Sequence, residues 1–334
     1  MKIFITGVAG FLGSHLADLM ISEGHTVAGN DNMIGGYTDN VPQNVEFYQV
    51  DCCDLENMTK AMEGCDIVYH TAATAYEGLS VFSPVLVTRN IFEASVTTIT
   101  AAIRNKVKRI VYCSSMARYG HHDQMPYKET YECRPQDPYG IAKKAGEDVL
   151  KNLCETHGVE YVIAVPHNIV GPRQKYDDPF RNVMSIMLNR MLQGKQPIIY
   201  GDGEQQRCFS YIDDCLYCLN ALAFQDNVVG EVINIGPDEE PITINKLAEA
   251  CANETGLNLD PIHHKDRPKE VKLAVCSSDK ARELLGYATA TNMRQSVKKT
   301  AEYIRTRGTK KFQYHLPLEI INDQTPDTWK NKLI

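Results

Sequence analysis

The segment KIFITGVAGFLGSHL, Lys2 to Leu16, decides the fold of this chain. A short apolar run leads directly into Gly7, Gly10 and Gly13, which are spaced as G-x-x-G-x-x-G, and an amphipathic pattern follows. This order predicts a strand, a tight turn and a helix whose N-terminal N–H groups face a bound anion. Glycines at this spacing also let the backbone approach a pyrophosphate closely, so the segment predicts a dinucleotide-binding unit.

An acidic residue supports this interpretation. Asp31 stands at the end of the next apolar run, about 20 residues after the glycines, where a carboxylate accepts hydrogen bonds from the ribose of an adenosine. Its negative charge repels a 2′-phosphate and therefore favours NAD over NADP. The alternative is a glycine-rich turn with an incidental surface aspartate. However, the strand, glycines, helix and acid follow one another in the order and at the spacing of a dinucleotide-binding unit.

Short apolar runs alternate with helical patterns through the first half of the chain. We expect an α/β fold with a doubly wound parallel sheet of the Rossmann type, because strands and helices in alternation are joined by right-handed crossovers. The rhythm changes near Pro166, so we predict an NAD-binding domain at 1–165, rejoined by parts of 205–236, and a smaller C-terminal α/β substrate lobe with a tail at 166–334. The glycines at 201–203 predict a hairpin in that lobe. The expected strands are KIFIT, HTVAG, VEFYQV, DIVYH, RIVYCSS and EYVIAV.

The composition is that of an ordinary globular protein, with 334 residues of which 43% are hydrophobic and 23% charged. A net charge of -7 argues against a general nucleic-acid binder. The N-terminus has no signal-peptide h-region, and no apolar run reaches the ~18 residues of a membrane span, so we expect a cytoplasmic protein without a membrane partner. Eleven scattered cysteines suit a reducing compartment. The lone C-x-x-C of Cys215 and Cys218 is interpreted as two packed thiols, and no metal is expected.

A second group of residues has the composition of a catalytic set. Ser115 follows the apolar run RIVYC, and Tyr139 and Lys143 form an i to i+4 pair at the start of an expected helix. A tyrosine titrates near ~10, so it needs help to act as a base at neutral pH, and a lysine one turn away favours the phenolate. A surface Tyr–Lys pair is the alternative, but the dinucleotide unit upstream favours the catalytic interpretation.

Together these motifs resemble the extended short-chain dehydrogenase/reductase family, in its nucleotide-sugar epimerase and dehydratase branch. The matching segments span nearly the whole chain and are TGVAGFLGS, NDN, QVDCCD, HTAA, SSMARYG, PYGIAKKAGE, PHNIVGPRQ, GDGEQQRCFSYIDD and RPKEVK. The resemblance implies NAD as the cofactor, held by Gly7, Gly10, Phe11, Leu12, Gly13, Asp31, Asn32, Asp51, Cys52, Thr71, Ala72, Ala73, Tyr139 and Lys143. It implies substrate contacts at Ser115, Asn168, Arg207, Arg267 and Ala274.

The resemblance also implies a mechanism. Tyr139 takes a proton from a sugar hydroxyl while a hydride passes from the same carbon to NAD, Lys143 lowers the tyrosine pKa, and Ser115 binds the hydroxyl. Sugar 4,6-dehydratases carry an Asp-Glu pair after the hydroxyl residue, and UDP-glucuronate decarboxylases carry a Glu, where this chain has Met116 and Ala117. Because neither side chain transfers a proton, we predict a nucleotide-sugar 4-epimerase that acts through a 4-keto sugar, on a UDP-hexose or UDP-N-acetylhexosamine.

Other interpretations stay open. A nucleotide-sugar C4 dehydrogenase or reductase uses the same three residues but releases the keto sugar, and a non-catalytic dinucleotide-binding protein needs none of them. Ala75 stands where epimerases of the UDP-glucose type often have a lysine. Arg118, beside the catalytic loop, is either a substrate contact or a surface arginine. The small Ala274 either leaves room for an N-acetyl group or fills a strand.

Two further expectations concern assembly and the C-terminus. Related enzymes form homodimers through a four-helix bundle whose segments correspond to 84–105 and 139–157 of this chain, so the resemblance implies a homodimer. The tail at 310–334 holds the single tryptophan, Trp329. It packs either across the second lobe or against a partner subunit.

Overall fold

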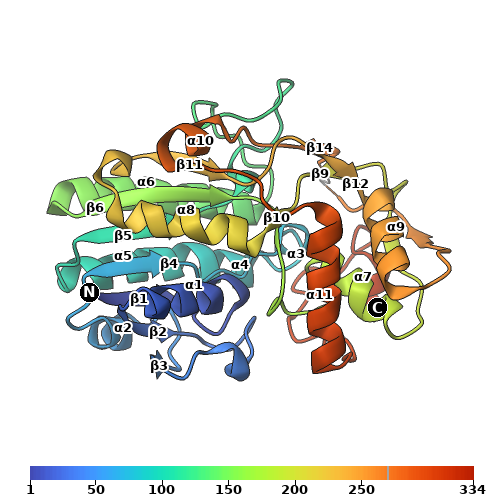
Figure 1. Cartoon of the computed structure of the whole chain (residues 1–334), viewed down its shortest axis with the longest axis horizontal. Coiled ribbons are helices and arrows are strands. Elements are labelled where there is room, and N and C mark those ends of the chain that lie inside the picture. The colour runs from blue at the N-terminus through green and yellow to red at the C-terminus, as the bar shows by residue number, and fades with distance from the viewer. Residues whose placement is uncertain (269–270) are drawn as a thin grey trace.

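The computed structural model describes residues 1–268 and 271–334. Seven parallel strands form the central sheet of the first lobe, in the order β11-β6-β5-β4-β1-β2-β3 (Figure 1). The six runs predicted as strands become β1 to β6, and β11 joins beside β6 from much later in the chain. The predicted doubly wound α/β fold is confirmed. The strands are β1 (Lys2–Thr6), β2 (Thr26–Asn30), β3 (Val45–Tyr48), β4 (Ile67–His70), β5 (Arg109–Cys113), β6 (Glu160–Pro166) and β11 (Val232–Ile235).

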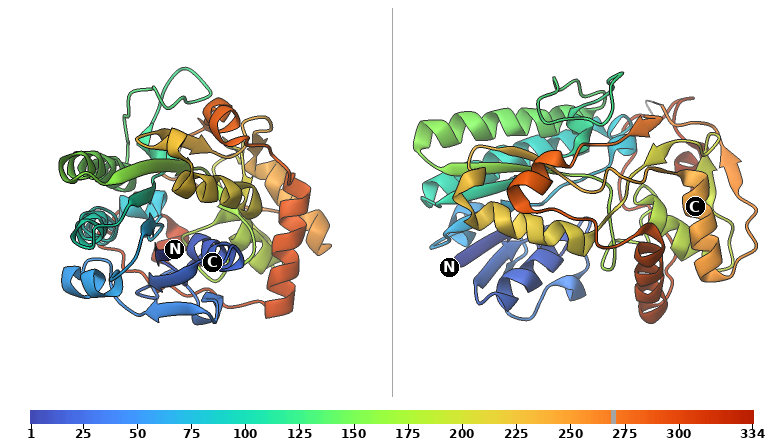
Figure 2. Two further views of the ribbon diagram at one scale, coloured as in Figure 1. Left: turned by 60° about the vertical axis from the view of Figure 1, so that its left-hand side comes forward. Right: turned by 45° about the horizontal axis from the view of Figure 1, so that its top comes forward.

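Helices cover both faces of this sheet. The helices α1, α8 and α10 pack on one face, and α2, α5 and α6 pack on the other (Figure 1, Figure 2). Because both faces are buried, every residue of a strand such as β5 is buried, and after Arg109 the strand is apolar without alternation. The helices are α1 (Phe11–Ser22), α2 (Leu55–Ala61), α3 (Glu77–Ser80), α4 (Pro84–Thr88), α5 (Ala94–Arg104), α6 (Pro138–His157), α8 (Ile212–Phe224) and α10 (Asp279–Leu285). A π-helical segment, η2 (Arg89–Glu93), joins α4 to α5, and the 3₁₀ helices are η1 (Thr38–Asn40), η3 (Met116–Arg118) and η4 (Asp226–Val228).

Three helices build the core of the second lobe, beside the carboxyl ends of the central strands (Figure 1). They are α7 (Val183–Met191), α9 (Ile244–Thr255) and α11 (Met293–Arg307). The chain crosses between the lobes more than once, because α8 and β11 return to the first lobe after α7. Short strands complete the second lobe and its junction: β7 (Ile169–Val170), β8 (Ile198–Tyr200), β9 (Gln206–Arg207), β10 (Ser210–Tyr211), β12 (Ile242–Thr243), β13 (Ile262–His264) and β14 (Leu273–Ala274).

The predicted hairpin at 201–203 is wrong. The turn is present, since Gly201 and Gly203 have φ values of 70° and 74°. However, β8 before the turn pairs with β13, whereas β9 after it pairs with β12 and β14. The turn residues fix the local change of direction, but the partners of each strand come from residues far away in the sequence.

The tail after α11 connects the two lobes. In the first lobe, the Glu319 carboxylate accepts hydrogen bonds of 2.8 and 2.9 Å from the N–H groups of Val85 and Leu86 at the start of α4. On the second lobe, the Tyr200 hydroxyl is hydrogen-bonded to the hydroxyl of Thr328, which lies in the short helix α12 (Asp327–Lys330) of the tail. The tail is therefore hydrogen-bonded to both lobes.

No helix of the described residues combines the length and apolar character of a membrane span.

Trp329 is the apolar anchor of the tail. Its side chain is 2% exposed and packs edge-on against Phe82 of the first lobe and Phe180 of the loop before α7, at centroid distances of 6.1 and 5.4 Å. The tail thus packs on the second lobe, as one of the two expectations states, and also on the first lobe at the junction between them. An aromatic side chain as large as tryptophan buries much apolar area, so Trp329 is suited to anchor the tail at this junction.

Replacing Trp329 by Ala should lower the free energy of unfolding by about 3 kcal/mol, because a large-to-small change leaves a cavity between the lobes. Urea denaturation followed by circular dichroism measures this loss. The matched control is Ile321→Ala, whose side chain is 59% exposed on the same tail. Equal effects of the two variants would contradict the anchoring role of Trp329.

Candidate active site

A cavity of ≈ 490 Å³ lies between the lobes. It opens at the carboxyl ends of the central strands, which is where open α/β sheets bind their ligands. The structure brings every residue that the sequence predicts as a cofactor or substrate contact to the walls of this one cavity. Within the described residues, no cluster of three His, Cys, Asp or Glu side chains could hold a metal ion.

The glycine turn after β1 leaves no room for side chains. A Cβ atom on Gly13 would lie 2.3 Å from the Gly7 carbonyl oxygen, and one on Gly7 would lie 2.9 Å from Cα of Ala72. Gly7 also has a φ of 71°, which residues with a side chain rarely adopt. Helix α1 follows with Gly10 as its N-cap and without a side-chain cap, so its first N–H groups are free to bind an anion. The turn therefore fits a dinucleotide pyrophosphate.

Asp31, directly after β2, fits the ribose of the same ligand. Its carboxylate accepts hydrogen bonds from the N–H groups of Ala9, at 3.1 Å, and Met33, at 2.7 Å. Burial raises the pKa of Asp31, while these N–H groups lower it. The carboxylate is thereby fixed beside the glycine turn, in the position that the sequence predicts for ribose recognition.

Tyr139 and Lys143 lie on the first turns of α6. This helix begins as predicted, because Pro138 stands in its first turn and the Asp137 carboxylate caps it with a hydrogen bond of 2.8 Å. The Lys143 ammonium donates a hydrogen bond of 2.8 Å to the carbonyl of Cys113 at the end of β5. Burial lowers the pKa of Lys143 to about 8, so most of the lysine is still protonated at neutral pH.

The ionisation of Tyr139 depends on both lobes. Burial raises the pKa of its hydroxyl. The charge that lowers this pKa most is the guanidinium of Arg181, and a hydrogen bond from Ser115 lowers it further. The sequence assigns the pKa-lowering role to Lys143, whose ammonium is hydrogen-bonded to a carbonyl in the structure. The largest charge effect that lowers the pKa of Tyr139 comes from Arg181 of the second lobe.

Arg118 is neither a substrate contact nor a surface arginine. Its side chain is 4% exposed and forms an ion pair of 2.9 Å with the fully buried Glu147 of α6. The same glutamate accepts a hydrogen bond from the Ser114 hydroxyl. The ion pair thus ties η3, which directly follows Ser115, to the helix that carries Tyr139. The sequence could not reveal this role, because the partner lies 29 positions later in the chain.

The second half of the cavity comes from the second lobe. Asn168 has a φ of 45°, and its amide donates a hydrogen bond of 2.9 Å to the Cys208 carbonyl. Arg207 of β9 lies opposite Ala274 of β14 in a parallel pair. The Arg267 guanidinium stacks on the ring of Tyr200, 5.0 Å from its centroid. These side chains all line the cavity.

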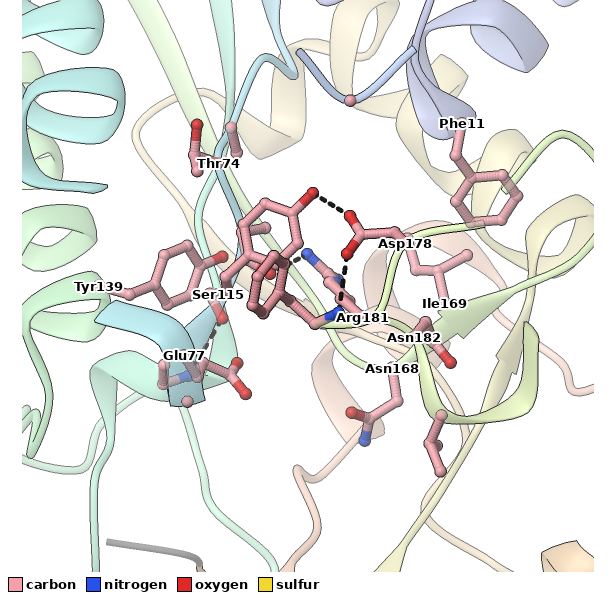
Figure 3. Close-up of a pocket in the computed structure, with 18 of the residues that line it drawn as sticks. Phe11, Thr74, Glu77, Ser115, Tyr139, Asn168, Ile169, Asp178, Arg181 and Asn182 are labelled. Atoms are coloured by element: carbon pink, nitrogen blue, oxygen red, sulfur yellow. Dashed lines mark hydrogen bonds between the residues drawn. The ribbon is translucent and has the colours of Figure 1, made fainter. Parts of the chain in front are cut away.

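Several cavity residues were not found from the sequence. They come from the start of α3 and from the irregular loop between β7 and α7. Figure 3 labels four of them, Glu77, Asp178, Arg181 and Asn182, in the same pocket as Ser115 and Tyr139. The Tyr76 hydroxyl donates to the buried Asp178, and Arg181 donates to the carbonyl of Ala75. The only sequence signal is the dense run of charges in KYDDPFRN, at 175–182, which gives no direction for any side chain. The residues concerned are Tyr76, Glu77, Asp178, Phe180, Arg181 and Asn182.

A family model matches most of the first lobe and part of the second. The model describes the NAD dependent epimerase/dehydratase family and matches residues 3–236. The match covers the glycine turn, Ser115, Tyr139, Lys143 and Arg207.

Three proteins illustrate the similarity beyond the family model. The crystal structure of a UDP-glucose 4-epimerase from Thermotoga maritima with UDP-glucose is 31% identical and covers 92% of this chain and 99% of its own, with a TM-score of 0.86. That of a UDP-glucuronic acid 4-epimerase from Bacillus cereus with UDP-glucuronic acid and NAD is 28% identical, covering 92% and 100%, with a TM-score of 0.84. GDP-mannose 3,5-epimerase of Arabidopsis thaliana is 30% identical over 91% of this chain and 82% of its own.

Replacing Arg118 by Ala should lower the free energy of unfolding by about 3 kcal/mol, because it leaves the Glu147 carboxylate buried and unpaired. The loss should shrink as the pH falls, since Arg118 lowers the pKa of Glu147 and the unpaired carboxyl takes up a proton more readily. Urea denaturation at several pH values measures both effects. The control is Arg104→Ala, which breaks an exposed pair with Glu56. A loss of unfolding free energy as small as that of Arg104→Ala would refute a stabilising role for the buried pair of Arg118 and Glu147.

Proposed function

The chain belongs to the NAD dependent epimerase/dehydratase family, and from this we propose that it is an NAD-dependent nucleotide-sugar 4-epimerase that acts on a UDP-hexose or UDP-N-acetylhexosamine. One observation carries the proposal. Ser115, Tyr139 and Lys143 meet in a single cavity whose one half fits a dinucleotide and whose other half carries Arg207 and Arg267. A tyrosine base between a cofactor and a substrate site suits a reversible proton and hydride exchange at one carbon.

The protein residues divide the work of proton transfer. Tyr139 as phenolate takes the proton of the sugar 4-hydroxyl, and Ser115 donates a hydrogen bond to the same oxygen as it becomes a ketone. Bound NAD supplies the acceptor and later the donor of a hydride. Lys143 keeps a positive charge beside the reacting atoms and is held in place by the Cys113 carbonyl. After the keto sugar turns over, so that the opposite face of C4 would receive the returning hydride, Tyr139 returns the proton to the C4 oxygen.

The residues after Ser115 favour 4-epimerisation over elimination of water and over epimerisation at C3 or C5. Met116 and Ala117 line the cavity next to Ser115, and neither can transfer a proton. Elimination of water from a keto sugar, or inversion at C3 or C5, needs a further acid or base at the neighbouring carbons. Exchange of the hydrogens on those carbons with solvent therefore distinguishes such reactions from a simple 4-epimerisation.

Substrate contacts follow from the second half of the cavity. We assign the diphosphate to Asn168, Arg207 and Arg267, since arginines hold phosphate oxygens in a fixed fork geometry. Ala274 is buried and adds little bulk beside Arg207, which is consistent with a substituent on the sugar. Residues 166–334, apart from the segment that returns to the central sheet, form the substrate lobe in this proposal.

Location and assembly are further parts of the proposal. The structure holds eleven free cysteines, most of them buried, which supports a reducing compartment such as the cytoplasm.

Val85 of α4 and Ile141 of α6 are 72% and 54% exposed, on helices that contact each other. A second copy of this apolar helical surface would cover it in a two-fold homodimer with a four-helix bundle.

The purified protein with NAD should convert UDP-glucose or UDP-N-acetylglucosamine to the C4 epimer without net formation of NADH, and Tyr139→Phe should lower the rate about 1000-fold. NMR of the sugar, together with absorbance of NADH, measures both. In D₂O the product should contain no deuterium on carbon. The control is Tyr217→Phe, an exposed tyrosine on α8.

Other results of this assay identify other functions. A keto sugar with an equal amount of NADH identifies a C4 dehydrogenase, and deuterium at C3 or C5 identifies a different epimerase or a dehydratase. Bound NAD without turnover of any nucleotide sugar would refute the proposal in favour of a non-catalytic dinucleotide-binding protein.

The double variant Val85→Asp and Ile141→Asp should shift the protein from dimer to monomer, because it places charges in the proposed apolar contact. Sedimentation velocity measures the mass of each form. Ile321→Asp, an equally exposed change on the tail, should leave the dimer intact. A wild-type protein that sediments as a monomer would contradict the proposed assembly.

A further inference from the structure

Arg181 is a cation at the reacting end of the cavity. It stands at the end of the loop that precedes α7 and lines the cavity together with Ser115 and Tyr139. Its guanidinium donates a hydrogen bond to the carbonyl of Ala75, which fixes it beside the segment after β4. In Figure 3 the Arg181 guanidinium and the Tyr139 hydroxyl lie in the same part of the cavity.

The guanidinium has donors to spare. An arginine has five N–H donors, and one of those of Arg181 is used by the Ala75 carbonyl. Within the part of the chain that the structure describes, no carboxylate lies within ion-pair distance of Arg181. Its side chain is exposed to the cavity rather than covered by protein. A planar fork of free donors in a concave site suits a planar anion.

The acids nearest to Arg181 do not neutralise it. Asp178 accepts hydrogen bonds from the Tyr76 hydroxyl and from the N–H of Phe180, and burial raises its pKa. Asp177 is engaged by Lys175 at 3.0 Å and by a tyrosine hydroxyl. Glu77 lines the same end of the cavity and also lies near Tyr139, but it forms no ion pair with the guanidinium in the described residues. The positive charge therefore remains available to a ligand.

Arg181 is distinct from the arginines assigned to the diphosphate. Arg207 lies on β9 of the second lobe. Arg267 lies in the loop after β13 and stacks on Tyr200 at the end of β8. Arg181 instead acts on Tyr139, whose pKa it lowers more than any other charge does. The cavity thus offers cationic groups at two places, one for the nucleotide diphosphate and one for the sugar ring.

We propose that Arg181 binds a carboxylate on the sugar ring, so that the preferred substrate is a nucleotide-linked hexuronate. This inference rests on the proposed 4-epimerase function, which places the 4-hydroxyl at Tyr139. In a hexuronate the carboxylate carbon is attached to C5, directly next to C4, so the carboxylate lies close to the 4-hydroxyl. A guanidinium beside Tyr139 is therefore in the right region for a two-hydrogen-bond contact with that group.

Binding to the Tyr139→Phe variant, saturated with NAD, tests the proposal without turnover. Titration calorimetry compares UDP-glucuronate and UDP-galacturonate with UDP-glucose and UDP-galactose. At least one hexuronate should bind about tenfold more tightly than its neutral counterpart, since a charged pair in a protected site contributes at least this factor. Both C4 epimers are measured, because the ring turns over during the reaction and one guanidinium needs to hold the carboxylate in only one orientation.

Variants at position 181 test whether Arg181 causes the preference for hexuronates. In the same background, Arg181→Gln should weaken hexuronate binding about 30-fold and change the binding of the neutral sugars less than threefold. Arg181→Lys should restore part of the preference, because it keeps the charge without the fork. Arg294→Gln, an exposed arginine of α11, is the matched control and should change none of these affinities.

The outcomes separate this inference from the proposed function. Epimerisation of neutral UDP-sugars by the wild type, with no tighter binding of hexuronates, overturns the inference and leaves the function standing. A hexuronate preference that survives Arg181→Gln also overturns the role of Arg181. If the wild type binds and converts no UDP-sugar, neutral or acidic, the proposed function fails, and the inference fails with it.

Discussion

The contact between α6 and β5 is the constraint on which the site depends. Tyr139 and Lys143 belong to α6, while Ser115 directly follows β5, so their mutual geometry is the geometry of this one helix on this one strand. The contact is close because Gly146 faces Tyr112: a Cβ at that position would lie 2.3 Å from the tyrosine oxygen. Polar contacts then fix how the helix sits on the strand. The Lys143 ammonium donates to the Cys113 carbonyl, and the Glu147 carboxylate accepts a hydrogen bond from Ser114 and forms an ion pair with Arg118.

The parts of the site that the sequence predicts are those with a local cause. The glycine turn is specified by the residues around it: the preceding strand β1, the spacing of the three glycines, and the lack of room for a Cβ atom at Gly7 and Gly13. The start of α6 is likewise specified by Asp137 and Pro138, which cap it and so place Tyr139. Parallel strands buried on both faces are visible as apolar runs, and the fold class follows from their alternation with helices.

The parts that the sequence misses depend on partners far away in the chain. Nothing near Arg118 shows that Glu147 will face it, so its burial as an ion pair is invisible locally. The turn at 201–203 is real, yet the strands on either side pair with segments that follow much later. Arg181 sits in a loop without periodicity, and only the docking of the second lobe on the first brings it to Ala75.

The two cations near Tyr139 belong to different lobes of the protein. Lys143, beside the reacting atoms, belongs to the first lobe, but the charge that most lowers the pKa of Tyr139 comes from the second lobe with Arg181. The ionisation of the tyrosine therefore depends on how closely the lobes approach. The tail, held by Glu319 on one lobe and by Thr328 on the other, restrains that approach. Trp329 fills the junction beside Phe180, next to Arg181 in the chain, so the tail that closes the fold also supports the loop that completes the site.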